Sequence, residues 1–188
     1  MTGKIFVLSG PSGGGKTTLC NRLLKISPKL VRSVSVTTRR PRQGEIEGKD
    51  YFFVSRNDFG KLRRHKGLLE WTEYNHSFYG TPLQPLREFL KKGKSVILLL
   101  DGPGARKVKR RFKEATTIFL LPPSFGDLKK RLAGRRTEKK SDLAKRLRIA
   151  EKEMSHIGWY DYIIVNDELH RAVRALRQVV RENHWGES

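Results

Sequence analysis

Short apolar runs alternate with amphipathic segments along this chain, and turn-forming residues separate them. Four apolar runs are typical of buried strands, because polar residues or Gly and Pro flank them: residues 5–8, 96–100, 117–121 and 162–165. Four other segments repeat apolar residues at helical spacing, at residues 19–26, 125–132, 143–157 and 169–180. Strands that alternate with helices predict a parallel sheet with flanking helices, so the expected fold class is α/β.

Two segments depart from this alternation. Residues 33–85 hold short segments rich in Thr, Tyr and Phe with Gly and Pro between them, which predicts a small β-rich insertion. Residues 134–141 are polar and dense in charge between two helical patterns, so we expect a mobile surface loop that acts as a lid. No apolar run approaches the roughly 20 residues that cross a bilayer, which favours a cytoplasmic protein without membrane contact.

Charge narrows the class of partner. The formal net charge is +21, and residues 105–148 hold 16 Lys or Arg against 4 Asp or Glu. This excess predicts an anionic partner, either a phosphate-rich substrate or nucleic acid bound without sequence specificity. The single cysteine, Cys20, permits no intramolecular disulfide and is expected to be a small apolar residue of a helix.

One motif carries direct chemical information. The pattern G-x-x-x-x-G-K-[ST] is complete in Gly10, Pro11, Ser12, Gly13, Gly14, Gly15, Lys16 and Thr17. An apolar strand precedes it and an amphipathic helix follows it, as a phosphate-binding loop requires. Lys16 would reach the β- and γ-phosphates of a nucleotide, and the Thr17 hydroxyl would bind Mg²⁺. The loop predicts nucleotide binding and says little about the acceptor.

A second phosphate site is the simplest interpretation of residues 33–54. This stretch concentrates Arg, hydroxyl groups and Tyr with few aliphatic residues to bury. Arg binds phosphate through two parallel hydrogen bonds, and hydroxyl groups complete the shell. An exposed basic hairpin remains the alternative on residue types alone.

Several motifs occur in an order that resembles the guanylate kinase family nearly end to end. They are GPSGGGKTTL, SVSVTTRRPRQGEIEGKDYFFVS, LLEW, YGTP, PPSFGDLKKRLAGR, KRL and DYIIVND. The resemblance implies a P-loop nucleoside-monophosphate-kinase fold in a single domain. It implies a core of residues 1–32, 86–124 and 158–188, a GMP-binding insertion at 33–85 and a helical lid region at 125–157.

The resemblance also implies roles for individual residues. It puts at the GMP phosphate Arg39, Arg42, Tyr51 and Tyr79. It puts at or near the guanine base Ser35, Glu70, Thr81 and Asp101. It implies phosphate-binding lid arginines at Arg131 and Arg135, around the end of one helix, and at Arg146, at the start of the next. It also implies ATP contacts from the P-loop, Thr18 and Asn166. An ionised Glu70 can accept hydrogen bonds from guanine N1 and N2, whereas adenine offers no such pair of donors on that edge. The alternative for Glu70 is a surface carboxylate beside Trp71.

Two positions depart from the family pattern. Leu99 stands where the family usually has the first of two acids. The chain therefore lacks the carboxylate that would organise waters around Mg²⁺ at this position. Arg136 stands where the family usually has Gly, a change that either stiffens the lid or adds a phosphate contact.

The sequence therefore predicts an enzyme that converts ATP and GMP to ADP and GDP with Mg²⁺, with dGMP as a further candidate acceptor. One alternative is a kinase of the same scaffold for another phosphorylated acceptor, such as a ribose phosphate. A second alternative is a non-enzymatic module that binds phosphopeptides or proteins. The retained Lys16 and Thr17 argue against the module, and Glu70 argues against the other acceptor. Both a monomer and a homodimer fit the sequence.

Overall fold

The computed structural model describes residues 3–74, 76–133 and 140–184. Its strands are β1 (Ile5–Ser9), β2 (Leu30–Arg32), β3 (Val36–Thr37), β4 (Phe52–Phe53), β5 (Leu68–Tyr74), β6 (Ser77–Pro82), β7 (Ser95–Leu99), β8 (Thr116–Leu121) and β9 (Tyr162–Val165). Its helices are α1 (Lys16–Lys25), α2 (Arg56–Arg64), α3 (Leu83–Lys91), α4 (Gly102–Arg111), α5 (Phe125–Ala133), α6 (Lys140–Met154) and α7 (Leu169–His184).

The central sheet is parallel and has the strand order β2-β7-β1-β8-β9. The four strands expected from the apolar runs are confirmed as β1, β7, β8 and β9, and β2 is an edge strand that the pattern did not indicate. In the middle strand β1, Ile5 and Val7 face one side, and Phe6 and Leu8 face the other. Because both faces of the sheet are covered, its inner strands are almost continuously apolar.

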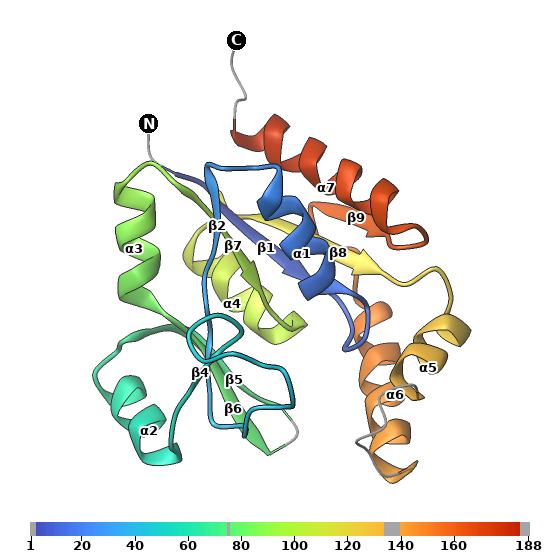
Figure 1. Cartoon of the computed structure of the whole chain (residues 1–188), viewed down its shortest axis with the longest axis horizontal. Coiled ribbons are helices and arrows are strands. Elements are labelled where there is room, and N and C mark those ends of the chain that lie inside the picture. The colour runs from blue at the N-terminus through green and yellow to red at the C-terminus, as the bar shows by residue number, and fades with distance from the viewer. Residues whose placement is uncertain (1–2, 75, 134–139, 185–188) are drawn as a thin grey trace.

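Helices form a layer on each side of this sheet (Figure 1). On one side, α1 and α7 pack through Leu19, Leu23 and Leu176 against β1, β8 and β9. On the other side, α3 and α4 pack through Leu86 and Val108. The four helices expected from apolar spacing are confirmed as α1, α5, α6 and α7, while α3 and α4 were not expected. The fold class, a parallel sheet with flanking helices, is thus confirmed.

A second, smaller sheet lies below the first in Figure 1 and has the order β4-β3-β6-β5. Helix α2 covers it, with the buried Phe59 packed against Val36 and Leu68. The expectation of short strands in residues 33–85 held, but the segment also contains this helix. The Ser55 hydroxyl caps α2 by accepting a hydrogen bond from the Asp58 backbone N–H at 3.1 Å.

Helices α5 and α6 pack on each other through Leu128, Leu132 and Ala150. Two expectations need correction here. The polar segment expected to be a loop over residues 134–141 is helical from Lys140 onward, and residues 134–139 lie outside the described ranges. Arg146 lies in the middle of α6 and does not begin it. None of the described helices combines the length and apolarity needed to cross a bilayer.

Candidate active site

The P-loop follows β1, the middle strand, at the carboxyl edge of the sheet, where open α/β sheets bind ligands. Gly10, Gly13 and Gly15 have φ angles of 142°, 84° and 96°, which side-chain-bearing residues rarely adopt. The Lys16 ammonium folds back over the loop and donates to the carbonyl oxygens of Gly10 and, at 3.1 Å, Pro11. The loop therefore holds its cation where phosphate oxygens would meet it.

Asn166 supports the loop from the end of β9. Its side-chain Nδ2 donates to the Gly14 carbonyl oxygen at 2.8 Å, and a Cβ at Gly15 would lie 2.5 Å from the same nitrogen. The Arg131 guanidinium donates in turn to the Asn166 carbonyl oxygen at 3.3 Å. Asn166 is buried, so the structure places it against the P-loop backbone, and its expected contact with adenine stays a prediction.

Two adjoining cavities contain most of the predicted site residues. A cavity of about 180 Å³ lies between the P-loop, the smaller sheet and α6. Its lining includes the predicted Gly10, Ser12, Lys16, Ser35, Arg39, Arg42, Tyr51, Glu70, Tyr79, Asp101 and Arg146. A cavity of about 580 Å³ beside it is lined by the predicted Ser12, Gly13, Gly15, Lys16, Thr17, Thr18, Ser35, Arg42 and Tyr51. Both cavities are lined by Lys16, together with Ser12, Ser35, Arg42, Tyr51 and Leu99, so they share a wall.

The predicted phosphate side of the smaller cavity is already ordered. The Arg39 guanidinium donates to the Tyr79 hydroxyl at 3.2 Å and to the Glu45 carboxylate at 2.8 Å. It also lies 5.4 Å from the centre of the Tyr51 ring. Glu45 accepts a further hydrogen bond from the Arg42 backbone N–H at 2.7 Å. These contacts hold a guanidinium and two phenols in positions suited to bind one phosphate.

Glu70 lies at the predicted base side, where β5 contains an irregularity. Leu68 pairs with Pro82 but Trp71 pairs with Gly80, so the stretch between them holds one extra residue. Such bulges redirect a side chain, and here Glu70 accepts from the Thr81 hydroxyl at 2.7 Å. Burial, and to a smaller extent the nearby Asp101 carboxylate, raise the pKa of Glu70 to about 7.

Asp101 holds the start of α4 beside Glu70. Its carboxylate accepts from the Gly104 backbone N–H at 2.8 Å and from the Thr72 hydroxyl at 2.9 Å. If residue 104 had a side chain, its Cβ would lie 3.0 Å from a Glu70 carboxylate oxygen. Glycine at this position therefore lets the start of α4 lie close to Glu70. Asp101 therefore fixes both a helix terminus and the surroundings of Glu70.

Three polar side chains of the smaller cavity were missed by sequence reasoning: Thr72, Tyr74 and Glu153. Tyr74 shares a side-chain hydrogen bond with Ser12 and so joins the smaller sheet to the P-loop. Glu153 reaches in from α6 and accepts from the Gly102 backbone N–H. Burial, only partly offset by Lys16, raises the pKa of Glu153 to about 7. In sequence, this acid looks like any exposed charge of an amphipathic helix.

Some predicted residues lie outside the two cavities. Pro11 and Gly14 are buried within the loop. Thr81 is buried behind Glu70, and Arg131 is exposed on α5 and bonded to Asn166. The predicted Arg135, together with the departure at Arg136, lies outside the described ranges.

Leu99 lines both cavities at the end of β7, beside Thr17 in the larger one. Within the described ranges, no three His, Cys, Asp or Glu side chains form a cluster that could hold a metal ion. An exposed Thr17 hydroxyl at the first turn of α1 nevertheless fits Mg²⁺, which keeps several waters and binds through phosphates with few protein ligands.

A P-loop and a second set of arginine and tyrosine side chains thus line adjoining cavities that share Lys16, which defines a P-loop phosphotransferase with a phosphorylated acceptor. The guanylate kinase family model matches residues 2–183. The chain belongs to the guanylate kinase family, ATP-dependent phosphotransferases that phosphorylate GMP.

Individual relatives agree with this assignment. A guanylate kinase of Halalkalibacterium halodurans is 44% identical over 97% of this chain and 89% of the relative. One of Geobacter sulfurreducens is 46% identical over 95% of this chain and 88% of the relative. The crystal structure of guanylate kinase from Anaplasma phagocytophilum matches with a TM-score of 0.83 and 36% identity, covering 97% of this chain and 87% of that one. None of these matches supports the two alternatives raised from the sequence, which were a kinase for another phosphorylated acceptor and a non-enzymatic binding module.

Proposed function

We propose that this chain transfers the γ-phosphoryl group of ATP, bound at the P-loop, to the phosphate of GMP, bound against the smaller sheet, and releases ADP and GDP. One observation carries the proposal. The cavity of about 180 Å³ is lined by Lys16 from the P-loop and, facing it, by Arg39 and Tyr79. Donor and acceptor phosphates held by these two sets would meet beside one fixed cation, which is the arrangement that in-line transfer requires.

On the donor side, the backbone N–H groups of the glycine-rich loop and the start of α1 bind the β- and γ-phosphates. On nucleotide binding, the Lys16 ammonium exchanges its bonds to the loop carbonyls for phosphate oxygens. Mg²⁺ carried with ATP and bound by Thr17 would neutralise charge on the phosphates. Asn166 keeps the loop in shape through Gly14.

On the acceptor side, Arg39, Arg42, Tyr51 and Tyr79 hold the GMP phosphate, and Ser35, Glu70 and Asp101 surround the base. Glu70 binds guanine N1 and N2 as a carboxylate, and Thr81 fixes its orientation. A base without these two donors would leave a buried carboxylate unsatisfied, which gives strong selectivity.

The lid supplies charge during transfer. Arg146 from α6 lines the same cavity as Lys16, so it stabilises charge that develops on the transferred group. We assign the same role to Arg135, and to Arg131 a supporting role through Asn166. Glu153, from the same helix as Arg146, positions α6 against the start of α4 through Gly102.

The deciding experiment is a coupled assay of purified protein with ATP, Mg²⁺ and each of GMP, dGMP, AMP, CMP and UMP. We expect the guanine substrates to form diphosphate at least about tenfold faster than the others. Equal rates with AMP and GMP would contradict the role of Glu70. The use of dGMP, the choice between monomer and homodimer, and the cytoplasmic location stay predictions.

A further inference from the structure

A row of exposed arginines runs along α7, on the side of the molecule away from the acceptor site. Arg174, Arg177 and Arg181 follow each other at helical spacing, so one face of the helix carries all three. Within the described ranges, no salt bridge joins any of them to a carboxylate, whereas Arg171 on the same helix pairs with Asp167 and Glu168. The row is therefore a concentration of charge that the fold itself does not neutralise.

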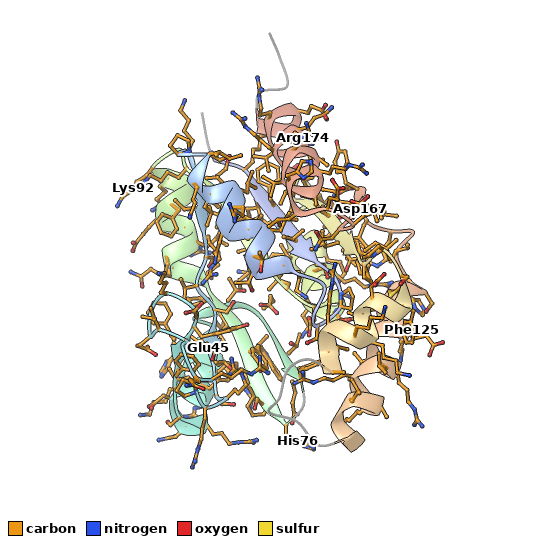
Figure 2. All side chains as sticks on the ribbon, turned by 45° about the vertical axis from the view of Figure 1, so that its right-hand side comes forward. Glu45, His76, Lys92, Phe125, Asp167 and Arg174 are labelled. Carbon is orange, nitrogen blue, oxygen red and sulfur yellow. The ribbon has the colours of Figure 1, made fainter. Side chains whose placement is uncertain are left out.

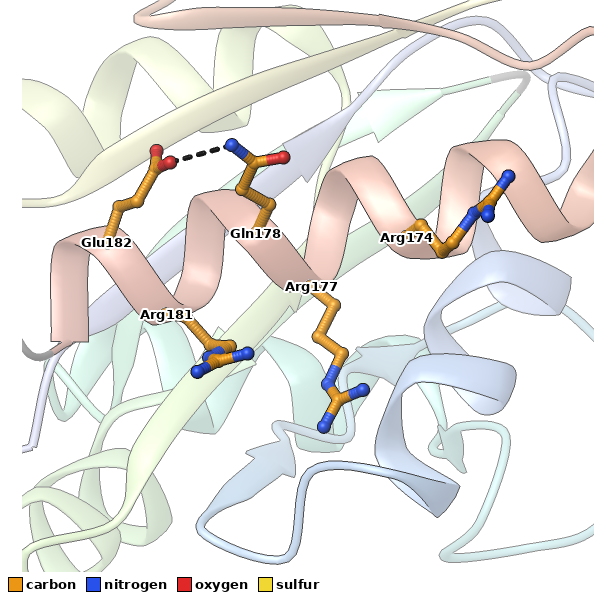
Figure 3. A pocket seen from close by; sticks show the side chains of 5 residues that line it. All are labelled: Arg174, Arg177, Gln178, Arg181 and Glu182. Carbon is orange, nitrogen blue, oxygen red and sulfur yellow. Dashed lines mark hydrogen bonds between the residues drawn. The ribbon is translucent and has the colours of Figure 1, made fainter.

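Among the five residues drawn in Figure 3, Glu182 is the only acid, and its side chain points away from the arginines. Glu182 accepts a hydrogen bond from the Gln178 side chain at 2.8 Å, on the side of α7 away from Arg177 and Arg181. Helix α1, which packs beside α7, ends in a basic turn with Arg22 and Lys25. The sequence has no Asp or Glu before Glu45, so the neighbouring segment adds no negative charge.

An apolar groove of about 320 Å³ lies directly beside two of these arginines. Its apolar lining comes from the end of α1, the connection to β2, and α7: Ile26, Pro28, Leu30 and Val180. Arg177 and Arg181 form its rim, and Ile26 is 44% exposed. The groove lies at the opposite end of α1 from the P-loop, about 15 Å along the helix axis.

The lining indicates which kind of anion fits. Single-stranded nucleic acid binds through bases stacked on aromatic rings, and none of the described residues that line this groove is aromatic. Aliphatic side chains instead suit one bulky apolar side chain of a peptide, and Arg binds carboxylates through two parallel hydrogen bonds. We propose that α7 and the end of α1 form a docking surface for an acidic protein segment. One apolar side chain of the segment enters the groove, and its flanking carboxylates pair with Arg177 and Arg181.

The test measures binding of a fluorescein-labelled peptide in which acidic residues flank one leucine, by anisotropy at low and physiological salt. Binding of this leucine peptide is compared with binding of three other probes: the same peptide with serine for leucine, a labelled oligouridylate of equal charge, and anionic lipid vesicles. The test variant is Arg177→Glu with Arg181→Glu. Its matched control is Arg87→Glu with Lys91→Glu, the same charge change at the same spacing on α3. The end of α3, marked by Lys92, lies across the molecule from Arg174 (Figure 2).

We expect the α7 variant to lose about tenfold or more in affinity for the leucine peptide, and the α3 variant to lose much less. Ile26→Gln, which leaves the charge unchanged, should weaken the leucine peptide and leave the serine peptide unaffected. All variants should keep guanylate kinase activity, because the groove is remote from the P-loop.

Several outcomes overturn the proposal. Equal losses in the α7 and α3 variants would mean that only net charge attracts the peptide. Tighter binding of oligouridylate or vesicles than of the leucine peptide would assign the surface to nucleic acid or lipid. Equal binding of the serine and leucine peptides would show that no leucine side chain enters the groove. No binding of the leucine peptide at low salt would show that the surface does not bind acidic segments.

Discussion

The donor and acceptor sides of this active site are built in different ways. The predicted donor side is one run of consecutive residues, Gly10 to Thr18, and we expect its backbone to do most of the binding. The acceptor side is assembled from side chains of β5, β6, the start of α4 and the segments that flank β3 and β4, and several of them are held by another side chain. A backbone site tolerates little change in shape, whereas a side-chain site can change its specificity by single substitutions.

The two sides also differ in charge. The donor side presents an ammonium beside carbonyl oxygens. The acceptor side combines arginines with the buried Glu70 and the half-buried Asp101, a set that we expect both to attract a phosphate and to discriminate between bases. The following predictions test this difference, from the largest expected effect to the smallest.

Removing the donor cation should have the largest effect. Lys16→Ala should lower kcat by about 10²–10³, because a fixed cation next to the transferred group is lost. The melting temperature should stay within a few degrees of wild type, since the ammonium contacts loop carbonyls and supports no core. The rate is measured in a preparation free of host kinases. Turnover near wild type would falsify the proposed donor site.

Neutralising the base-reading acid should change specificity more than rate. Glu70→Gln should raise KM for GMP by about 10–100-fold and narrow the gap between GMP and AMP, because the amide presents a donor where guanine also donates. Glu73→Gln, an exposed acid of the same strand, is the matched control and should have no effect. Steady-state kinetics with both substrates decide the point, and an unchanged preference would remove Glu70 from the base site.

Glu153 should matter for rate more than for substrate binding. Glu153→Gln should lower kcat by about tenfold with a small change in KM, because α6 loses its charged contact with the start of α4 and Arg146 is less well placed. Glu151→Gln, exposed on the same helix, is the control. A larger effect on KM than on kcat would mean that Glu153 acts on GMP binding instead.

The raised pKa of Glu70 makes stability depend on pH. Its pKa is about 7 in the folded chain against an ordinary value of 4.5, so the folded state binds more protons between these values. The free energy of unfolding should therefore fall as pH rises from about 4.5 to 7, by on the order of 1 kcal/mol. Glu70→Gln should show a smaller fall in denaturant titrations across this range. An equal slope in wild type and variant would contradict the assigned pKa.

The smallest effect concerns Leu99. Restoring an acid by Leu99→Asp should lower the Mg²⁺ concentration for half-maximal rate by about two- to fivefold, because the side chain lies beside Thr17 and can order waters of the ion. Asp101→Asn should raise KM for GMP and leave the Mg²⁺ midpoint unchanged, since Asp101 contacts Thr72 and α4. The opposite pattern in Mg²⁺ titrations at saturating GMP would transfer Asp101 to the metal site.

Sequence alone predicted the features that periodicity or a local motif encodes. The inner strands and α1, α5, α6 and α7 have long apolar patterns, and the P-loop is complete in eight residues. Helix α2 was missed because only Phe59 is buried in it, although Ser55 and Asp58 form a recognisable cap. Helix α3 was missed because it is short and contains Pro85.

Residue types indicated a second phosphate site, but the base side of the acceptor site was predicted only through the family resemblance. The extra residue before Trp71 that turns Glu70 toward Thr81 leaves no signal in the sequence, because it depends on the pairing of β5 with β6. Glu153 is far from the P-loop along the chain, and only the packing of α6 brings its carboxylate to Gly102. Contacts of this kind arise from tertiary structure and not from local spacing.

The hydrogen bond from Asn166 to Gly14 has a consequence for synthesis of the chain. The two residues are 152 positions apart, so the ribosome makes the P-loop long before the residue that supports it. Until β9 has joined β8, the loop lacks this hydrogen bond and the Arg131 contact behind it. A nascent chain arrested before residue 160 should therefore bind nucleotide poorly, and the ability to bind ATP would report that β9 has been made and has joined the sheet.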